Sequence, residues 1–200
     1  MSDAAAIITG CILAGGIGRR LGGIDKGLVD LAGRPLVAHV IERFAPQVDR
    51  LLLSVNRNHD CYRRYCGHLV DDTFSDAAGP LAGIAAALQA VDTPWLAIAP
   101  CDSPFLPRAL VARLHAAATT HHAEIAVART RDGLQPVFAL IATRLAPSLG
   151  DFLAGGGRKT DAWYARHAVV EVDCEAERKA FMNINTPDDL CAAALEITRP

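Results

Sequence analysis

The sequence of 200 residues predicts an α/β fold, in which a single three-layer α/β/α domain is built on a mostly parallel sheet. Short apolar runs alternate with segments of helical periodicity, which is typical of parallel strands joined by helices. A glycine-rich stretch follows the first apolar run, and polar side chains follow the next three. Since ligands of open parallel sheets bind beyond the carboxyl ends of the strands, we expect these polar residues to share one site.

The first half of the chain contains four expected strands. A helix is expected after Pro35, which suits a first helical turn, because apolar residues recur from Leu36 to Phe44. A second helix opens at Gly79 and runs to about Ala90. The four expected strands are Ile7–Leu13, Leu51–Val55, Leu69–Val70 and Trp95–Ala99.

The second half continues the alternation and ends with a capped helix. Thr186 is a good N-cap and Pro187 suits the first position of that final helix. The expected helices are Pro107–His121, Ala146–Ala154 and Thr160–Arg166, and the expected strands are Glu124–Ala128, Val137–Ile141, Val169–Val172 and Phe181–Asn185.

The composition is that of an ordinary globular protein, with 51% hydrophobic and 21% charged residues. The net charge of −2 argues against bulk binding to nucleic acid or to a membrane surface. No apolar run approaches the roughly 20 residues that span a bilayer. We therefore expect neither nucleic acid nor a membrane among the partners.

The cysteines indicate the compartment. Six are scattered along the chain without a C-x-x-C pair, and Cys11 and Cys101 lie inside apolar runs. The acidic start Met1-Ser2-Asp3 does not resemble a signal peptide. Free thiols of a cytoplasmic protein explain this pattern better than a disulfide framework, so the cytoplasm is the expected location.

The stretch from Leu13 to Lys26 has the chemistry of a phosphate-binding loop. Its glycines permit close backbone approach, so that several N–H groups can converge on one anion. Arg19, Arg20 and Lys26 add positive charge. The stretch is neither a P-loop nor a dinucleotide fingerprint, because no Gly-Lys-Ser/Thr closes it and Leu21 replaces the third glycine. A glycine-rich turn with solvated arginines is the simpler alternative, and the interleaved cations favour phosphate binding.

Asp102 is the candidate metal ligand. It follows the apolar strand at Trp95–Ala99 and stands between Pro100 and Pro104, which restrict the local backbone. Mg²⁺ bound to phosphates keeps most of its waters and needs only one or two carboxylates from the protein. The alternative is a capping aspartate for the following helix.

Three further features remain open on the sequence alone. Gly79–Gly83 is either an anion-binding helix start or a tight turn. The basic loop containing Arg158 and Lys159 either receives a second phosphate-bearing substrate or is a surface turn. Asn183 and Asn185 alternate along an expected strand, so they face one side and either line a pocket or cap loops.

Four segments in this order resemble the molybdenum cofactor guanylyltransferases, within the wider nucleotidyltransferase superfamily. The resemblance covers about Ile8 to Leu190, and the last two segments narrow it to this family. The segments are Leu13-Ala14-Gly15-Gly16 with Arg20, Gly22, Gly23, Asp25 and Lys26, then Gly79-Pro80-Leu81-Ala82-Gly83, Pro100-Cys101-Asp102-Ser103-Pro104 and Asn183-Ile184-Asn185-Thr186-Pro187.

The resemblance implies a Rossmann-like nucleotidyltransferase fold and a set of site residues. It implies that Asp102 binds both nucleotide and Mg²⁺, and that Lys26 and Arg20 face the leaving diphosphate. Ser54 stands where some members carry an asparagine that touches the nucleotide. The implied nucleotide-binding residues are Leu13, Ala14, Gly15, Gly16, Lys26, Ser54, Asp72 and Asp102, and the implied pterin-facing residues are Asn183 and Asn185. The basic loop adds Arg158 and Lys159 as further candidates for the pterin side.

The implied reaction transfers GMP from GTP to the terminal phosphate of molybdenum-loaded molybdopterin and releases diphosphate. Residues of about 7–105 are then expected to bind the nucleotide, and those of about 106–197 to face the pterin. Molybdenum-insertion proteins and recipient molybdoenzymes are the further partners implied. The alternatives are a cytidylyltransferase of the same cofactor, a sugar-phosphate nucleotidyltransferase and a GTP-binding sensor.

Overall fold

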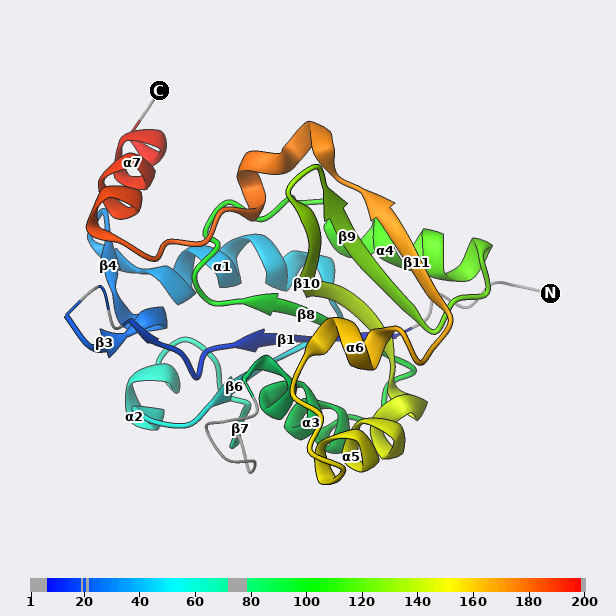
Figure 1. Ribbon diagram of the computed structural model, residues 1–200. Coiled ribbons are helices and arrows are strands. Elements are labelled where there is room, and N and C mark those ends of the chain that lie inside the picture. The colour runs from blue at the N-terminus through cyan, green and yellow to red at the C-terminus, as the bar shows by residue number, and fades with distance from the viewer. Residues whose placement is uncertain (1–6, 19, 21, 72–78, 199–200) are drawn as a thin grey trace.

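The computed structural model describes residues 7–18, 20, 22–71 and 79–198. Within these residues seven strands form the central sheet, in the order β11-β9-β10-β8-β1-β6-β7 (Figure 1). The strands are β1 (Ile8–Leu13), β6 (Arg50–Val55), β7 (Leu69–Asp71), β8 (Trp95–Pro100), β9 (Ile125–Thr130), β10 (Gly133–Ala142) and β11 (Val169–Asp173).

The sheet is mostly parallel, as predicted. β1 pairs in parallel with β6 and β8, β6 with β7, and β11 with β9. β10 runs antiparallel to both β8 and β9. Only Arg131 and Asp132 separate β9 from β10, and so short a connection forms a hairpin rather than a crossover.

Helices cover both faces of the sheet, which gives the predicted three layers (Figure 1). On one face Phe44 and Leu114 pack with Ile12 in one apolar core. On the other face Leu149 and Trp163 pack with Ile98 in a second core. The first face carries α1 (Leu36–Phe44) and α4 (Leu110–Thr120), and the second carries α3 (Pro80–Ala90), α5 (Ala146–Ala154) and α6 (Thr160–Tyr164).

Short elements surround the carboxyl ends of the first strands, and α7 packs against them. Leu31 and Leu36 share a third small core with Ile184 and Ala193 of the C-terminal part. The other elements are β2 (Ile17–Gly18), β3 (Ile24–Asp25), η2 (Lys26–Leu28), β4 (Asp30–Leu31), β5 (Arg34–Pro35), η3 (Ala45–Gln47), α2 (His59–Tyr62), η5 (Thr143–Leu145), η6 (Glu175–Phe181) and α7 (Pro187–Ile197).

The strand expected at Phe181–Asn185 is wrong. Phe181 ends η6, and no regular structure follows until α7 begins. The alternation that suggested a strand has another cause, because Ile184 is buried in the third core while Asn183 and Asn185 are exposed. The Ile184 N–H donates to the Asp102 carbonyl at 2.9 Å, which draws this segment alongside the end of β8.

Several helix limits differ from the expectation. The helix expected from Pro107 begins at Leu110, and the one expected to reach Arg166 ends at Tyr164. Pro35 lies one residue before α1 rather than in its first turn. The predicted cap of α7 is confirmed, since the Thr186 hydroxyl accepts from the Asp189 N–H at 3.1 Å.

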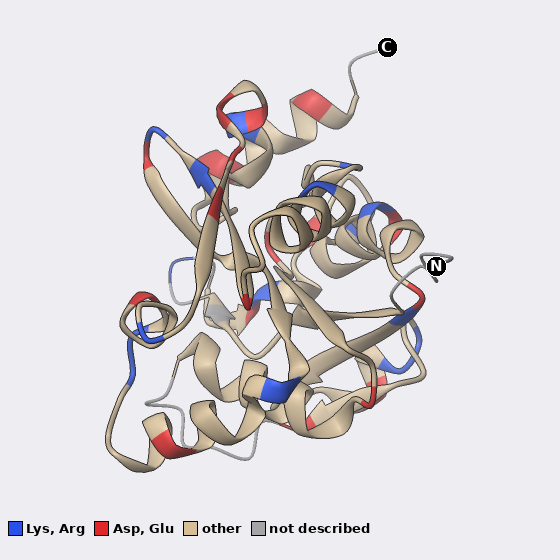
Figure 2. Cartoon of the chain, turned by 90° about the vertical axis from the view of Figure 1, so that its right-hand side faces the viewer, with Lys and Arg blue, Asp and Glu red and all other residues tan. Residues whose placement is uncertain are grey.

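Basic and acidic positions are interspersed along the described part of the chain (Figure 2). Among the residues that the structure describes, no helix has the length and apolar character needed to cross a bilayer.

Candidate active site

A cavity of about 510 Å³ lies at the carboxyl ends of β1, β6 and β8, on the edge where the sequence predicts a site. Segments far apart in the chain contribute to its walls, including the start of α3 and the residues that precede α7. It is lined by Leu13, Gly15, Gly16, Lys26, Ser54, Asn56, Arg57, Gly79, Pro80, Gly83, Pro100, Cys101, Asp102, Val137 and Asn183.

Gly15 and Gly16, in the glycine-rich loop that follows β1, form one wall of the cavity. Asn56 lies so close to Gly15 that a Cβ added there would stand 3.1 Å from the Asn56 Nδ2. The same amide donates to the Gly15 carbonyl at 3.1 Å. A side chain at position 15 would therefore displace Asn56, whereas glycine leaves the loop backbone open to the cavity.

The start of α3 closes the opposite side against β6. Gly79 has φ +58°, a conformation that glycine adopts without strain, and Pro80 follows as the first helical residue. A Cβ at Gly83 would stand 2.7 Å from the Ser54 Oγ and 3.0 Å from the Leu13 Cδ2. Gly83 therefore lets α3 approach the two strands, and the cavity lies between them.

Lys26 and Asp102 form an ion pair inside this cavity. The Lys26 Nζ lies 2.5 Å from the Asp102 Oδ2, and the two side chains are 18% and 7% exposed. The Asn185 Oδ1 accepts a second hydrogen bond from the same ammonium. The Lys26 N–H donates to the Gly16 carbonyl at 3.1 Å, so the backbone on which this side chain stands is fixed.

One oxygen of Asp102 is left without a partner. Its Oδ1 is buried and has no hydrogen bond within the described part of the chain. A buried carboxylate oxygen is costly to leave unpaired, so its presence in a cavity suits a cation or a donor brought by a ligand.

Mg²⁺ fits this single-carboxylate site. Among the described residues no group of three or more His, Cys, Asp and Glu side chains could enclose a metal ion. Mg²⁺ does not need such a cage, since it keeps several waters and takes further oxygens from bound phosphates. Asp102 Oδ1 is the atom that would hold it.

Asn183 lines the cavity from the segment before α7, and Asn185 in the same segment contacts Lys26. The Asn183 Oδ1 accepts from the Ser103 hydroxyl at 2.7 Å, and Ser103 is fully buried. Asn185 reaches Lys26 as described above. The segment that carries the two amides is not the expected strand, and each amide has a different partner.

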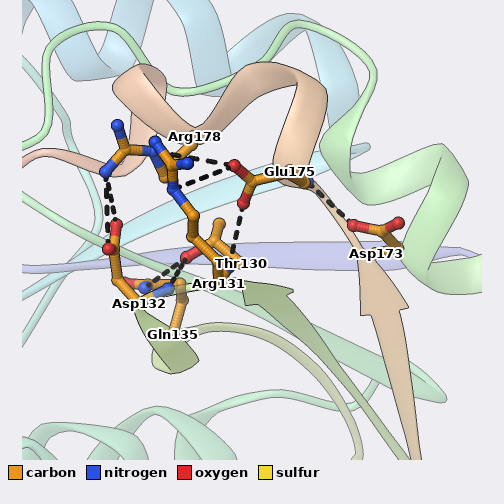
Figure 3. A network of polar contacts seen from close by, with 7 residues as sticks. All are labelled: Thr130, Arg131, Asp132, Gln135, Asp173, Glu175 and Arg178. Atoms are coloured by element: carbon orange, nitrogen blue, oxygen red, sulfur yellow. Dashed lines mark hydrogen bonds and ion pairs between the residues drawn. The ribbon is translucent and has the colours of Figure 1, made fainter.

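An ion-pair network outside the cavity fixes η6, the element from which this segment leaves (Figure 3). The Arg178 Nη1 lies 3.0 Å from the Asp132 Oδ2, and the Arg178 Nε lies 3.8 Å from the Glu175 Oε1. The Glu175 Oε2 also accepts from the Arg131 N–H at 2.9 Å. Since Arg131 and Asp132 form the turn between β9 and β10, the network ties η6 to the sheet.

Not every predicted site residue lines the cavity. Ala14 is fully buried and contributes only its backbone, whose N–H donates to the Ser54 carbonyl at 2.8 Å. Arg20 is exposed and outside the lining set. Asp72, predicted to contact the nucleotide, lies outside the described residues.

The basic loop between α5 and α6 is not brought to the cavity. Arg158 and Lys159 are exposed and do not belong to the lining set. Arg158 donates instead to the carbonyls of Leu153 at 2.9 Å and Gly157 at 2.6 Å, so it holds its own loop.

Several lining residues lie outside the set of predicted site residues, among them Asn56, Arg57 and Val137. Arg57 follows Asn56 at the end of β6, and this placement after a strand was the signal that could have found it. Val137 carries no such signal, because a register shift between Gln135 and Ala139 decides where it points.

Cys101 lines the cavity but is not suited to nucleophilic chemistry. Burial, and secondarily the neighbouring Asp102 carboxylate, raises the pKa of the Cys101 thiol well above its usual value. A thiol that stays protonated is a poor nucleophile, so Cys101 contributes to the cavity wall rather than to covalent chemistry.

Comparisons with known proteins agree with this geometry. Residues 10–170 match the family model described as the MobA-like NTP transferase domain. The chain is 48% identical over 196 residues to a protein of Burkholderia ambifaria named molybdenum cofactor guanylyltransferase, covering 94% of this chain and 95% of the relative. A protein of that name from Cupriavidus necator is 47% identical over 188 residues, covering 92% and 94%.

A solved structure supports the same assignment. Molybdopterin-guanine dinucleotide biosynthesis protein A from Archaeoglobus fulgidus superposes with a TM-score of 0.80 and 27% identity, covering 95% of this chain and 98% of that one. Both the fold and the sequence are therefore shared along nearly the whole length. The chain belongs to the molybdenum cofactor guanylyltransferases and is a nucleotidyltransferase.

Proposed function

We propose that this enzyme transfers GMP from GTP to the terminal phosphate of Mo-molybdopterin, forming Mo-molybdopterin guanine dinucleotide and diphosphate. The observation that carries the proposal is the meeting of Lys26, Asp102 and Asn185 at one point of the cavity, although 159 residues separate the first from the last. A cation, a carboxylate with a free oxygen and an amide suit phosphoryl chemistry rather than acid–base hydrolysis.

The nucleotide is proposed to lie across the glycine loop. Leu13, Gly15 and Gly16 line the cavity on the β1 side, and Ser54 lines it at β6. Ala14 would contribute its backbone to the nucleotide site, and Lys26 and Asp102 would face the phosphates. Asp72, which follows the last residue of β7 in the sequence, would contact the nucleotide. The carboxyl ends of these strands would thus contact GTP from its base to its reacting phosphate.

Transfer then needs positioning and charge neutralisation more than proton transfer. A terminal phosphate oxygen of the pterin attacks the α-phosphorus of GTP, the bond to the β-phosphate oxygen breaks, and its electron pair leaves on diphosphate. The attacking phosphate is already ionised at neutral pH, so no general base is required. Lys26 would exchange its contact with Asp102 for the departing diphosphate, where its charge stabilises the transition state.

Mg²⁺ is the proposed metal, with Asp102 Oδ1 as its protein ligand. When bound, it supplies positive charge to the phosphate oxygens. Releasing Asp102 from Lys26 would leave both charges available to the substrate, the ammonium for diphosphate and the carboxylate for the metal.

The acceptor is proposed to approach from the side of the segment before α7. Asn183 lines the cavity there and Asn185 holds Lys26, so residues of about 106–197 would face the pterin and those of about 7–105 would bind GTP. Arg20, Arg158 and Lys159 are exposed cations that would join only if their loops close over bound substrate. We also propose a cytoplasmic location, with molybdenum-insertion proteins and recipient molybdoenzymes as partners.

Diphosphate release tests the proposal. The protein is incubated with Mg²⁺ and each of GTP, CTP, ATP and UTP, with and without molybdenum-loaded molybdopterin. We expect diphosphate only with GTP and the pterin together. Preferred release with CTP would indicate a cytidylyltransferase. Diphosphate release with a sugar phosphate in place of the pterin would indicate a sugar-phosphate nucleotidyltransferase. GTP binding without diphosphate would indicate a sensor.

A further inference from the structure

Tyr62, the last residue of the short helix α2, lies against the glycine loop although its side chain does not line the cavity. It is fully buried. Its hydroxyl donates to the Asp25 Oδ1 and lies 3.3 Å from the Ala14 carbonyl oxygen. A hydroxyl has one proton to give, so the carboxylate is its partner and the carbonyl lies beside that bond.

Asp25 is held at both oxygens. Its Oδ2 accepts from the Asn58 Nδ2 at 3.0 Å, while Tyr62 occupies Oδ1. Asp25 is only 5% exposed, and a carboxylate so buried needs these donors to remain in place. Its neighbour in the chain is Lys26, whose ammonium is the cation of the site.

Tyr62 also lies close to Gly27, the residue that follows Lys26 in the chain. A Cβ added at Gly27 would stand 2.5 Å from the Tyr62 Oη, so that either the phenol or the loop would have to shift. The phenol therefore touches the residues before and after Lys26. With the Lys26 N–H bound to the Gly16 carbonyl, the backbone at position 26 has little freedom.

We propose that Tyr62 is a positioning residue, which through Asp25 holds the Lys26 ammonium where it must meet the leaving diphosphate. This inference rests on the proposed guanylyl transfer and adds a residue to it. Tyr62, Asp25 and Asn58 form what we call the loop clamp. The clamp acts behind the cavity wall, so substrate does not touch it.

The electrostatics of the clamp suit a permanent donor. Burial raises the pKa of the Tyr62 hydroxyl far above its usual value, and the hydrogen bond to Asp25 raises it further. The hydroxyl thus stays protonated throughout the range in which the enzyme can work. Its bond to Asp25 is not a pH switch but a fixed part of the scaffold.

Tyr62→Phe tests the clamp with little change of volume. We expect kcat to fall about tenfold, since a hydrogen bond to a charged group is lost and the ammonium is displaced. KM for GTP should change less than about twofold, because the lysine acts mainly on the transition state. Asn58→Ala, which removes the donor to the other oxygen, should lower kcat in the same way. Unchanged kcat in Tyr62→Phe would overturn the proposal.

Thr93→Val is the matched control. It also removes one buried hydroxyl, which donates to the Thr9 Oγ1 at 2.8 Å, but it lies before β8, at the edge of the sheet opposite to the cavity. We expect a similar loss of thermal stability and an unchanged kcat. If both variants lost kcat equally, general destabilisation would explain Tyr62→Phe and the clamp would be refuted.

A double-mutant cycle shows whether Tyr62 acts through Lys26. In a Lys26→Ala background, where the ammonium is already gone, Tyr62→Phe should lower the remaining rate by less than about twofold. A further tenfold loss there would contradict the route through Lys26.

Hydrogen exchange gives a reading that does not need turnover. Amides of residues 13–28 should exchange faster in Tyr62→Phe than in the wild type, and unchanged exchange would contradict the clamp. A wild type that releases no diphosphate would refute the proposed function instead, so the two failures are distinguishable.

Discussion

The Lys26 ammonium lies 2.5 Å from the Asp102 carboxylate, across 76 residues of sequence, and Asn185 shares the same ammonium. The two charges neutralise each other in a cavity where the proposed transfer would need each of them separately. GTP with its metal would separate them, the carboxylate turning to the cation and the lysine to diphosphate. Removing either charge should therefore affect turnover more than folding.

Lys26→Ala should lower kcat by on the order of a hundredfold, because one charge that stabilises the leaving diphosphate is lost. Steady-state diphosphate release measures this. Lys179→Ala is the control, since Lys179 is exposed at the end of η6 and outside the cavity. Equal rates for wild type and Lys26→Ala would remove this lysine from the reaction.

Asp102→Asn should leave only a low rate that no longer responds to added Mg²⁺. The amide keeps the size of the side chain but cannot offer two anionic oxygens to a cation. A Mg²⁺ titration of wild type and variant provides the measurement. Asp92→Asn, which breaks the exposed pair with Arg50, should titrate like the wild type. Full activity with normal Mg²⁺ dependence in Asp102→Asn would contradict the metal assignment.

Asn183→Ala should raise KM for the pterin severalfold and leave KM for GTP almost unchanged. In the proposed arrangement Asn183 lies on the acceptor side of the cavity that it lines, so its loss should affect one substrate. Ser103→Ala is the matched variant, because it removes only the hydroxyl that donates to Asn183. A smaller change of the same kind is expected. If KM for GTP rose instead, this amide would belong to the nucleotide side.

Gly83→Ala and Gly150→Ala compare two helical glycines. At Gly83 the added methyl meets Ser54 and Leu13, so GTP binding should weaken and unfolding should become easier by about 1–3 kcal/mol. At Gly150, inside α5, nothing lies within 4 Å of the added Cβ, and alanine should stabilise the fold by about 0.5–1 kcal/mol. Denaturant unfolding and calorimetric GTP titration measure both effects. Tight GTP binding by Gly83→Ala would show that the approach of α3 to β6 is unimportant.

Much of the site could be predicted because it depends on local signals. Glycines after a buried strand and Asp102 between two prolines each mark a strand end, and parallel pairing brings such ends together. Asn185 could be placed near the site only by resemblance. Its actual partner, Lys26, follows from the path of the segment before α7, which residue spacing does not encode.

The remainder depends on tertiary contacts. Tyr62 lies in a four-residue helix with no recognisable periodicity, so its bond to Asp25 emerges only when α2 packs under the glycine loop. The alternation at Asn183–Asn185 was mistaken for a strand because burial of Ile184 produces the same period. The positive charges of Arg158 and Lys159 favour a phosphate-binding role, but residue type alone does not predict that their loop lies outside the cavity lining.

Transfer of label tests the central claim most directly. The protein is incubated with Mg²⁺, molybdenum-loaded molybdopterin and GTP labelled at the α-phosphate, and the products are separated. We predict that the label appears in the pterin dinucleotide in a one-to-one ratio with released diphosphate. Label that remains in GTP, or appears in free GMP while the pterin stays unlabelled, would contradict guanylyl transfer.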